Sequence, residues 1–212
     1  AALSQKLSRR HFSIGADGII CICAPVTASA DGRMRIFNAD GSEAQMCGNG
    51  VRCFAKFLVD HDYVNAESGS FVADTLAGPK PITFTVDAEN KLATATVDMD
   101  APILEAVLIP VAPNAETSPT AHKGTFTIDA EAIVVQTIES PWGAFAFACV
   151  SMGNPHAVLF MDEASEVDNL EIEKIGPKFE NHPLFPRRIN TEFVYPVDDH
   201  TLKMRVWERG AG

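Results

Sequence analysis

The chain has 212 residues, 46% of them hydrophobic and 21% charged, and this ordinary globular composition excludes a disordered or fibrous protein. Its 17 basic and 28 acidic residues give a formal net charge of -11, which argues against binding of a nucleic acid. The longest apolar runs are far shorter than the roughly 20 residues that cross a bilayer, so we expect no membrane span.

The N-terminus and the cysteine content bear on the compartment in which the chain works. The first ten residues contain no apolar signal core, so we expect a cytoplasmic protein. The chain starts with Ala1 rather than methionine, which suggests a trimmed fragment. Five cysteines are an odd number in a chain of this length, and they indicate reduced thiols rather than a disulfide framework.

The first half of the sequence predicts a sheet and one clear helix. Residues 18–24 and 32–38 have the patterns of two strands, and Asp40-Gly41 predicts a turn after the second. Apolar residues then recur at helical spacing, which predicts a helix from just after Cys47-Gly48-Asn49 to about Asp60. Further along, alternating runs at 82–86 and 92–99 predict a β-hairpin.

The second half begins after a segment rich in Pro, Thr, Ala and Asn, at 110–124, which we interpret as the crossing between two domains. We place the boundary near Pro110, which gives domains of 1–110 and 111–212. A short helix is predicted over 169–179. Strands are predicted at 126–128, 133–138, 144–151, 157–161, 191–195 and 201–207.

A short internal similarity suggests that the two halves follow one plan. Residues 34–38 read Met-Arg-Ile-Phe-Asn and residues 204–208 read Met-Arg-Val-Trp-Glu, both before a turn that contains glycine. Cys47 follows Asn38 by nine positions, and the matching position after Glu208 falls beyond Gly212. If the second half has a matching cysteine, we therefore expect it outside this chain.

Cys47 is the strongest candidate for chemistry. A thiol at the first turn of a helix faces unpaired N–H groups and the positive end of the helix dipole, which stabilise its thiolate and let it act as a base. Gly48, Asn49 and Gly50 keep these N–H groups accessible, so that they could hold a carboxylate. The alternative is a buried structural cysteine in a glycine-rich turn.

Two other kinds of site fit the sequence poorly. The glycines near Cys47 do not end in the Gly-Lys-Ser/Thr of a phosphate-binding loop. Cys21 and Cys23 have no nearby His or Cys at zinc-site spacing, so we predict no metal site and interpret both as core residues.

Polar residues at strand ends form a second group of candidates. Asn154 and His156 lie in a turn between two predicted strands, and Asn190 stands at the start of another. Glu208 and Arg209 follow an apolar strand, where the Arg could bind a carboxylate in a fork and the Glu could polarise a His or a thiol. Taken singly, each could also be a turn-forming, capping or solvated residue.

Together these segments resemble the diaminopimelate epimerase family over essentially the whole chain. The resemblance rests on five segments in the same order, at 35–43, 46–54, 153–158, 190–193 and 205–212. It implies an enzyme that interconverts LL- and meso-2,6-diaminoheptanedioate without pyridoxal phosphate or any other cofactor. The family's opening Gly-Asn-Asp-Phe segment, which would precede Ala1, is absent from this sequence.

The resemblance also implies a role for each candidate residue. Cys47 matches one of two catalytic cysteines, and the other belongs to a Cys-Gly-Thr-Gly segment after the Gly212 position. Gly18 departs from the family, because some members have a Gln there. The implied assignments are substrate contacts for Asn38, Asn154 and Asn190, carboxylate donors for Gly48 and Asn49, assistance of proton transfer for His156 and Glu208, and a distal substrate contact for Arg209.

The fold implied by the resemblance is of the α/β (α+β) class. It has two pseudo-symmetric domains, each a curved, mainly antiparallel sheet around a central helix, with the active site in the cleft between them. On this basis we expect the second domain to lack its central helix in this chain. The expected partner is the small-molecule substrate, and the sequence leaves open whether the enzyme is a homodimer.

Three alternatives remain at this point. The first is a related isomerase without pyridoxal phosphate, such as a proline racemase, although those enzymes typically have His at the position of Asn49. The second is an amino-acid-binding module that has lost catalysis. The third is a cysteine hydrolase with Cys47 as nucleophile and His156 as base.

Overall fold

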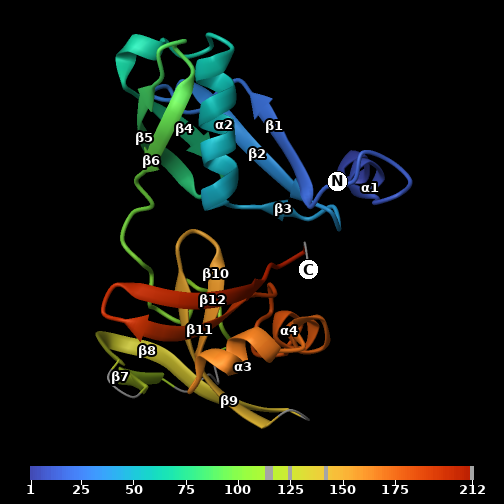
Figure 1. Cartoon of the computed structure of the whole chain (residues 1–212), viewed down its shortest axis with the longest axis vertical. Coiled ribbons are helices and arrows are strands. Elements are labelled where there is room, and N and C mark those ends of the chain that lie inside the picture. Colours follow the sequence, from blue (N-terminus) through green and yellow to red (C-terminus); the bar gives the residue numbers. More distant parts are fainter. Residues whose placement is uncertain (113–116, 124–125, 141–142, 211–212) are drawn as a thin grey trace. The chain divides into compact units, whose positions relative to one another are not determined.

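The computed structural model describes residues 1–112, 117–123, 126–140 and 143–210. The chain divides into two compact units, Ala1–Asp100 and Ala101–Gly210 (Figure 1). Each unit contains a six-stranded, mainly antiparallel sheet with helices packed on it, so the α+β class predicted from the sequence is confirmed. Within the described ranges, no helix is both long enough and apolar enough to span a membrane.

The first unit is built on a sheet with the strand order β1-β2-β4-β5-β6, and β3 pairs with β2. All neighbours are antiparallel except β2 and β4, which are parallel. The elements are α1 (Ala2–Ser8), β1 (Gly18–Cys23), β2 (Gly32–Asn38), β3 (Glu43–Ala44), α2 (Gly48–Asp60), η1 (Ala66–Ser68), β4 (Ser70–Thr75), β5 (Gly78–Val86) and β6 (Leu92–Val97).

Helix α2 lies across one face of this sheet, as Figure 1 shows. Its buried positions, Val51, Phe54 and Leu58 among them, pack against Met34 and Ile36 of β2. The sequence predicted this helix and the hairpin β5–β6, because both show clear apolar periodicity. It missed α1 and β4, which have weaker patterns.

The second unit has the strand order β12-β11-β10-β9-β8-β7, in which only β10 and β11 are parallel. Its elements are β7 (Thr117–Lys123), β8 (Phe126–Ser140), β9 (Gly143–Ser151), β10 (Pro155–Phe160), α3 (Ala164–Asn169), α4 (Ile172–Glu180), β11 (Asn190–Asp198) and β12 (Thr201–Trp207).

Three predictions for this half need correction. Residues 117–123, which we interpreted as part of an interdomain crossing, form a strand paired with β8; residues 113–116 and 124 of that segment lie outside the described residues. The strands predicted at 126–128 and 133–138 are one continuous strand. The helix predicted over 169–179 is replaced by α3 and α4, which are separated at Leu170-Glu171.

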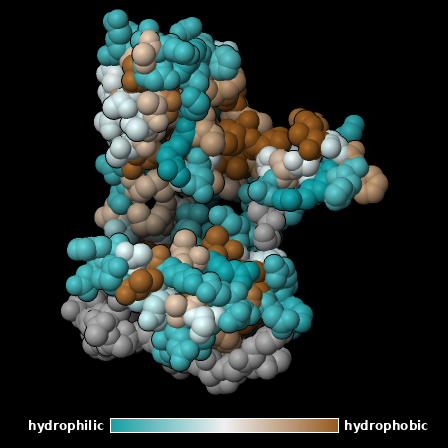
Figure 2. All heavy atoms as spheres, in the orientation of Figure 1, coloured by the Kyte–Doolittle hydropathy of each residue, from teal (hydrophilic) through white to brown (hydrophobic). Residues whose placement is uncertain are grey.

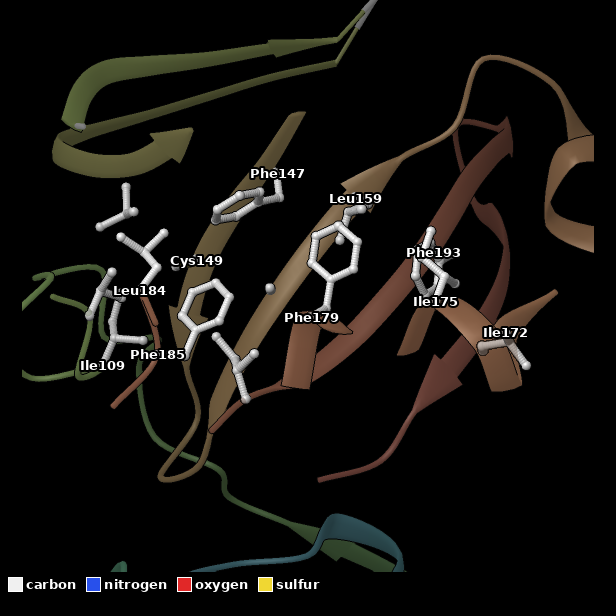
Figure 3. Close-up of a cluster of buried hydrophobic side chains, with 14 residues drawn as sticks. Ile109, Phe147, Cys149, Leu159, Ile172, Ile175, Phe179, Leu184, Phe185 and Phe193 are labelled. Carbon is white, nitrogen blue, oxygen red and sulfur yellow. The ribbon is translucent and has the colours of Figure 1, made fainter. Parts of the chain in front are cut away.

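The core of the second unit is rich in aromatic rings (Figure 3). Phe179 of α4 lies at its centre, and its ring makes edge-on contacts with Phe145, Phe147 and Phe193, at centroid distances of 5.8, 6.4 and 6.0 Å. Ring pairs of this geometry add about 0.5–1.5 kcal/mol each beyond the area that they bury. This packing fixes α4 on the sheet.

The boundary between the units differs from the predicted one. It falls after Asp100, whereas the sequence placed it near Pro110. Ile109 and Val111 are buried in the core of the second unit, and Ile103 forms a bridge to Ser151. Proline content alone therefore located the boundary too late, because the residues on both sides of Pro110 are packed.

The two similar segments found in the sequence occupy equivalent places. Residues 34–38 end β2, and residues 204–207 end β12. Each of these strands is the second member of an antiparallel pair, in which Ile20 lies opposite Ile36 and Glu192 lies opposite Val206. Since Ile36 corresponds to Val206 in the repeat, Glu192 occupies the place that Ile20 occupies in the first unit.

One face of β12 remains uncovered by the described residues. In the first unit Met34 and Ile36 are 2% and 8% exposed beneath α2, whereas their counterparts Met204 and Val206 are 55% and 38% exposed. Apolar side chains also reach the surface of the first unit over β1 and near α1 (Figure 2). Each unit therefore carries an apolar strip that its own described residues leave open.

Cys21 and Cys23 are not core residues, contrary to our interpretation. They alternate with Ile20 and Ile22 along β1 and therefore point to the sheet face opposite α2. Both thiols are half-buried. The apolar sequence of β1 suggested a fully buried strand, but its side chains are half-buried or exposed, with Ile20 and Ile22 at 37% and 38% exposure.

Candidate active site

Cys47 is the residue immediately before helix α2. Its backbone is extended, with φ -145° and ψ 112°, and its sulfur accepts a hydrogen bond from the N–H of Gly50 at 3.3 Å. The next N–H, that of Val51, donates to the carbonyl of Cys47 at 2.9 Å. The half-buried thiol thus serves as the N-cap of the helix, in the position that the sequence predicted.

Glycine allows the first turn of α2 to lie close to the sheet. A Cβ on Gly50 would lie 3.2 Å from Ile36 Cδ1 and 3.3 Å from Ile20 Cδ1, so this position leaves little room for a side chain. Gly48 and Asn49 are exposed. Their N–H groups belong to the first turn of the helix, where no earlier helical carbonyl is available, and they can bind an anion.

The loop that leads from β2 to Cys47 is ordered by polar contacts. Asn38 donates from its backbone N–H to Ser42 O at 2.9 Å and from its side-chain amide to Ser42 Oγ at 3.1 Å. Arg35 binds Glu43 through two hydrogen bonds of 2.7 and 3.0 Å, and this pairing holds the pKa of Glu43 below its ordinary value. These contacts set the path of the chain toward the helix start.

His156, in the second unit, contacts two side chains. Its Nδ1 lies 2.6 Å from Oε1 of Glu192, and its Nε2 lies 2.9 Å from Oδ1 of Asn154. Strand pairing explains the first contact, because β10 and β11 are parallel with His156 opposite Asn190, which places Glu192 two residues further along the same face. The sequence nominated Glu208 as the carboxylate of this half, but the carboxylate bound to His156 is Glu192.

Glu192 is a buried acid, with its side chain 11% exposed. Its second oxygen, Oε2, is buried and has no hydrogen-bond partner among the described residues. The thiol of Cys149 lies nearby, and burial, reinforced by the charge of Glu192, raises its pKa far above the ordinary value. Cys149 is therefore a structural thiol, and His156 and Glu192 form the hydrogen-bonded polar pair of this region.

Asn190 joins two segments that carry candidate residues. Its side-chain N–H donates to Pro155 O at 2.9 Å, and its Oδ1 accepts from the N–H of Arg209 at 2.9 Å. The residue is 4% exposed. In this structure, then, the amide ties the turn before His156 to the end of β12.

Glu208 and Arg209 lie in the turn after β12, which Glu180 holds in place. The buried carboxylate of Glu180 accepts from Arg188 Nη1 at 2.9 Å, from Trp207 Nε1 at 2.7 Å and from the N–H of Gly210 at 3.0 Å. Glu208 itself is exposed and has no side-chain partner within the part of the chain that the structure describes. Its carboxylate is therefore available to a ligand.

The site residues predicted from the sequence form two groups, one in each unit. Asn38, Cys47, Gly48 and Asn49 belong to the first unit, and the remaining five belong to the second. Glu192 and Glu180 were missed, although Glu192 lies within a segment that carried the family resemblance. A charged residue inside an otherwise apolar strand was the signal that could have identified it.

Comparison with known proteins supports the resemblance. The family model described as diaminopimelate epimerase matches residues 1–105 and 148–212. A diaminopimelate epimerase of Acetivibrio thermocellus is 45% identical over 99% of this chain, and one of Methanococcus maripaludis is 43% identical over the same share. The chain spans 67% and 68% of those two proteins, or about two thirds of their length.

Solved structures with little sequence similarity share the fold. A probable proline racemase from Agrobacterium radiobacter matches with a TM-score of 0.65 at 13% identity, over 95% of this chain and 57% of that protein. A hydroxyproline epimerase from Agrobacterium vitis matches with a TM-score of 0.61 at 11% identity, over 95% and 56%. At such identities the similarity concerns the fold alone.

Proposed function

The chain belongs to the diaminopimelate epimerase family, and on this premise we propose that it supplies the Cys47 half of an enzyme that epimerises LL-2,6-diaminoheptanedioate to the meso form. The observation that carries the proposal is the N-cap geometry of Cys47, whose sulfur accepts the Gly50 N–H at 3.3 Å. Nothing in the proposed reaction requires a cofactor. We further propose that the enzyme works in the cytoplasm and as a homodimer.

The reaction inverts one Cα, so a proton must leave one face of that carbon and another must arrive on the opposite face. The Cys47 thiolate takes the Cα proton and becomes a thiol, and the electron pair of the broken C–H bond is delocalised into the substrate carboxylate. An acid on the other face then delivers its own proton to Cα. A single base would tend to return the proton to the side from which it came.

The first turn of α2 suits the carboxylate at the reacting carbon. The exposed N–H groups of Gly48 and Asn49 can donate to its oxygens, and they bind more strongly as negative charge builds up on removal of the proton. The positive end of the helix dipole acts in the same sense. Cys47 and these donors share one turn, which keeps the base and the carboxylate close together.

Residues of the second unit complete the proposed machinery. Asn154 is assigned to polar groups of the substrate, Arg209 to its distal carboxylate, and His156 and the exposed Glu208 to assistance of proton transfer. We also assign Asn190 to substrate binding. Its side-chain N–H and its Oδ1 are both hydrogen-bonded to backbone groups, so we propose that it contacts the substrate through the two turns that it joins.

The second acid/base thiol is proposed to lie outside these 212 residues. The exposed strip on β12, formed by Leu202, Met204 and Val206, corresponds to the surface that α2 covers in the first unit. A second helix with an apolar face and a cysteine at its start would cover that strip in the same way. By itself, the chain then supplies only Cys47 of the two acid/base thiols that the reaction needs, and we expect that it does not epimerise diaminopimelate.

The proposal is tested by hydrogen exchange at Cα in deuterated water. The protein is completed with the flanking segments of the 45%-identical Acetivibrio thermocellus relative, and deuterium uptake into diaminopimelate and proline is followed by mass spectrometry. We expect uptake into diaminopimelate alone, and an at least 100-fold loss in Cys47→Ala, typical of the removal of a positioned base.

Two results would contradict the proposal. One is exchange into proline without exchange into diaminopimelate, and the other is full activity of the Cys47→Ala enzyme. Cys53→Ala is the matched control, because Cys53 is an exposed thiol on the same helix, six residues away, and takes no part in the proposed reaction.

A further inference from the structure

We infer that Glu192 is the positioning residue of His156, and that it lies where the helix carrying the second thiol begins. The inference rests on the proposed function, because it concerns the second acid of that reaction. It starts from the 2.6 Å contact between Glu192 Oε1 and His156 Nδ1 and from the equivalence of Glu192 with Ile20 in the internal repeat.

The repeat gives the location. In the first unit Ile20 supports the first turn of α2, since its Cδ1 lies 3.3 Å from the position of a Cβ on Gly50. Glu192 pairs with Val206 as Ile20 pairs with Ile36, so it is placed beneath the first turn of any helix that covers β12 in the same manner. That first turn is where a capping cysteine stands in the first unit.

The two half-sites therefore differ in chemistry. Beneath the turn of Cys47 the sheet presents two isoleucines, Ile20 and Ile36. At the equivalent place in the second unit it presents a carboxylate bound to an imidazole, with Glu192 11% and His156 22% exposed. The two units thus repeat the same backbone arrangement with different side chains. Cys47 stands above two isoleucines, whereas the second thiol would stand above the Glu192–His156 pair.

The hydrogen bonds define what Glu192 does to the imidazole. An ionised carboxylate only accepts, so the contact with Glu192 requires a proton on Nδ1 and directs Nε2 toward Asn154. In the second contact, between Nε2 and the Asn154 amide, the donor and acceptor depend on the tautomer of the ring. Glu192 thus fixes the orientation of the ring. It holds the Nδ1 proton and leaves Nε2 as the nitrogen that can give or take a proton.

Burial makes this contact specific. Oε2 of Glu192 is buried without a hydrogen-bond partner, so among the described residues His156 is the one side chain that hydrogen-bonds to this carboxylate. Its strand neighbours on either side, Val158 and Val206, offer no polar group. A buried acid with so few contacts contributes little to stability, which points to a role in orienting the imidazole.

The first experiment measures the ring nitrogens of His156 by 15N NMR in the 212-residue chain. In the wild type we expect the neutral ring to carry its proton on Nδ1, which faces Glu192. Glu192→Gln keeps an acceptor oxygen and should retain that tautomer, whereas Glu192→Val should move the neutral ring to the Nε2–H form. Glu173→Gln, an exposed carboxylate on α4, is the control and should change nothing. An unchanged tautomer in Glu192→Val would overturn the inference.

The second experiment uses the completed enzyme. We expect Glu192→Val to lower kcat by about 10–100-fold with little change in KM, the usual effect of losing a residue that orients a catalytic group. Glu192→Gln should recover part of that loss. An unchanged kcat despite a tautomer shift would show that positioning does not serve catalysis. If Glu192→Val shifts the tautomer but the completed wild-type enzyme does not exchange the Cα hydrogen of diaminopimelate, the proposed function is refuted. The positioning of His156 by Glu192 is then still supported.

Discussion

Gly176 lies directly against the indole of Trp207, so that a Cβ built on the glycine would come within 2.3 Å of the ring. The contact joins α4 to the end of β12, and Trp207 in turn donates from Nε1 to Glu180 at 2.7 Å. Glycine fits this position because the indole of Trp207 fills the space that a side chain would need.

Gly176→Ala should therefore destabilise the chain, even though alanine normally favours a helix. We expect a loss of about 1–3 kcal/mol in the free energy of unfolding, typical of overpacking, as measured by urea denaturation. Gly48→Ala is the control, because a Cβ there meets no atom within 4 Å; it should leave stability unchanged or raise it by up to about 1 kcal/mol. Equal effects of the two substitutions would contradict the steric explanation.

Glu180→Ala should destabilise the second unit by removing a buried acceptor shared by three donors. Breaking a buried ion pair costs about 3–5 kcal/mol, and we expect roughly 2–4 kcal/mol here because Arg188 is 35% exposed. Glu173→Ala, at an exposed position of the same helix, should stay within about 0.5 kcal/mol of the wild type. Urea denaturation of both variants checks the prediction, which fails if Glu180→Ala is as stable as the control.

Cys149 should resist alkylation in the folded chain. It is 1% exposed, and burial together with the charge of Glu192 raises the pKa of its thiol, so little thiolate forms at pH 8. Treatment with iodoacetamide followed by peptide mass spectrometry should label the exposed Cys53 in the native chain and Cys149 only after denaturation. Labelling of Cys149 at the rate of Cys53 in the native chain would show that the thiol is accessible.

Asp74 should make the stability of the first unit depend on pH. Burial alone would raise its pKa, but hydrogen bonds from Val26 N at 2.9 Å, Thr27 N at 3.3 Å and Thr27 Oγ1 at 3.2 Å outweigh burial and lower it. A pKa that is lower in the folded state stabilises the protein above the unfolded-state value of about 4, and this contribution disappears as the pH falls through the folded-state value.

Asp74→Asn should therefore reduce the free energy of unfolding at pH 7 more than at pH 3, as measured by urea denaturation at both values. The exposed Asp199→Asn serves as control and should show no such difference. A loss of unfolding free energy in Asp74→Asn that is equal at pH 3 and pH 7 would contradict the prediction. It would mean that the side chain stabilises the loop at Val26 without its charge.

The sequence predicted the elements whose apolar periodicity is strong, namely β1, β2, α2 and the hairpin β5–β6. It failed where local pattern and tertiary environment disagree. Residues 117–123 contain a proline and few apolar side chains, yet they form a strand because β8 supplies a pairing edge. Ile109 and Val111 flank a proline that suggested a linker, but both are buried in the core.

The candidate site was predictable to the extent that single motifs mark helix ends and turns. Cys47 was placed correctly because a glycine-rich segment before an apolar helical pattern locates an N-cap. The bond between His156 and Glu192 was not predictable, because it depends on β10 and β11 lying parallel, a pairing between strands about 30 residues apart that periodicity does not specify. The contacts of Glu180 with Arg188, Trp207 and Gly210 were not predictable for the same reason, because they join residues of different elements.

The edges of the two sheets have a practical consequence. Within the described residues, β1 and β12 each pair with a strand on one side only, and both carry exposed apolar side chains, Ile20 and Ile22 on the first and Leu202 and Met204 on the second. Open edges of this kind are templates for strands from other molecules. We therefore expect edge-to-edge aggregation of the purified chain to increase with its concentration.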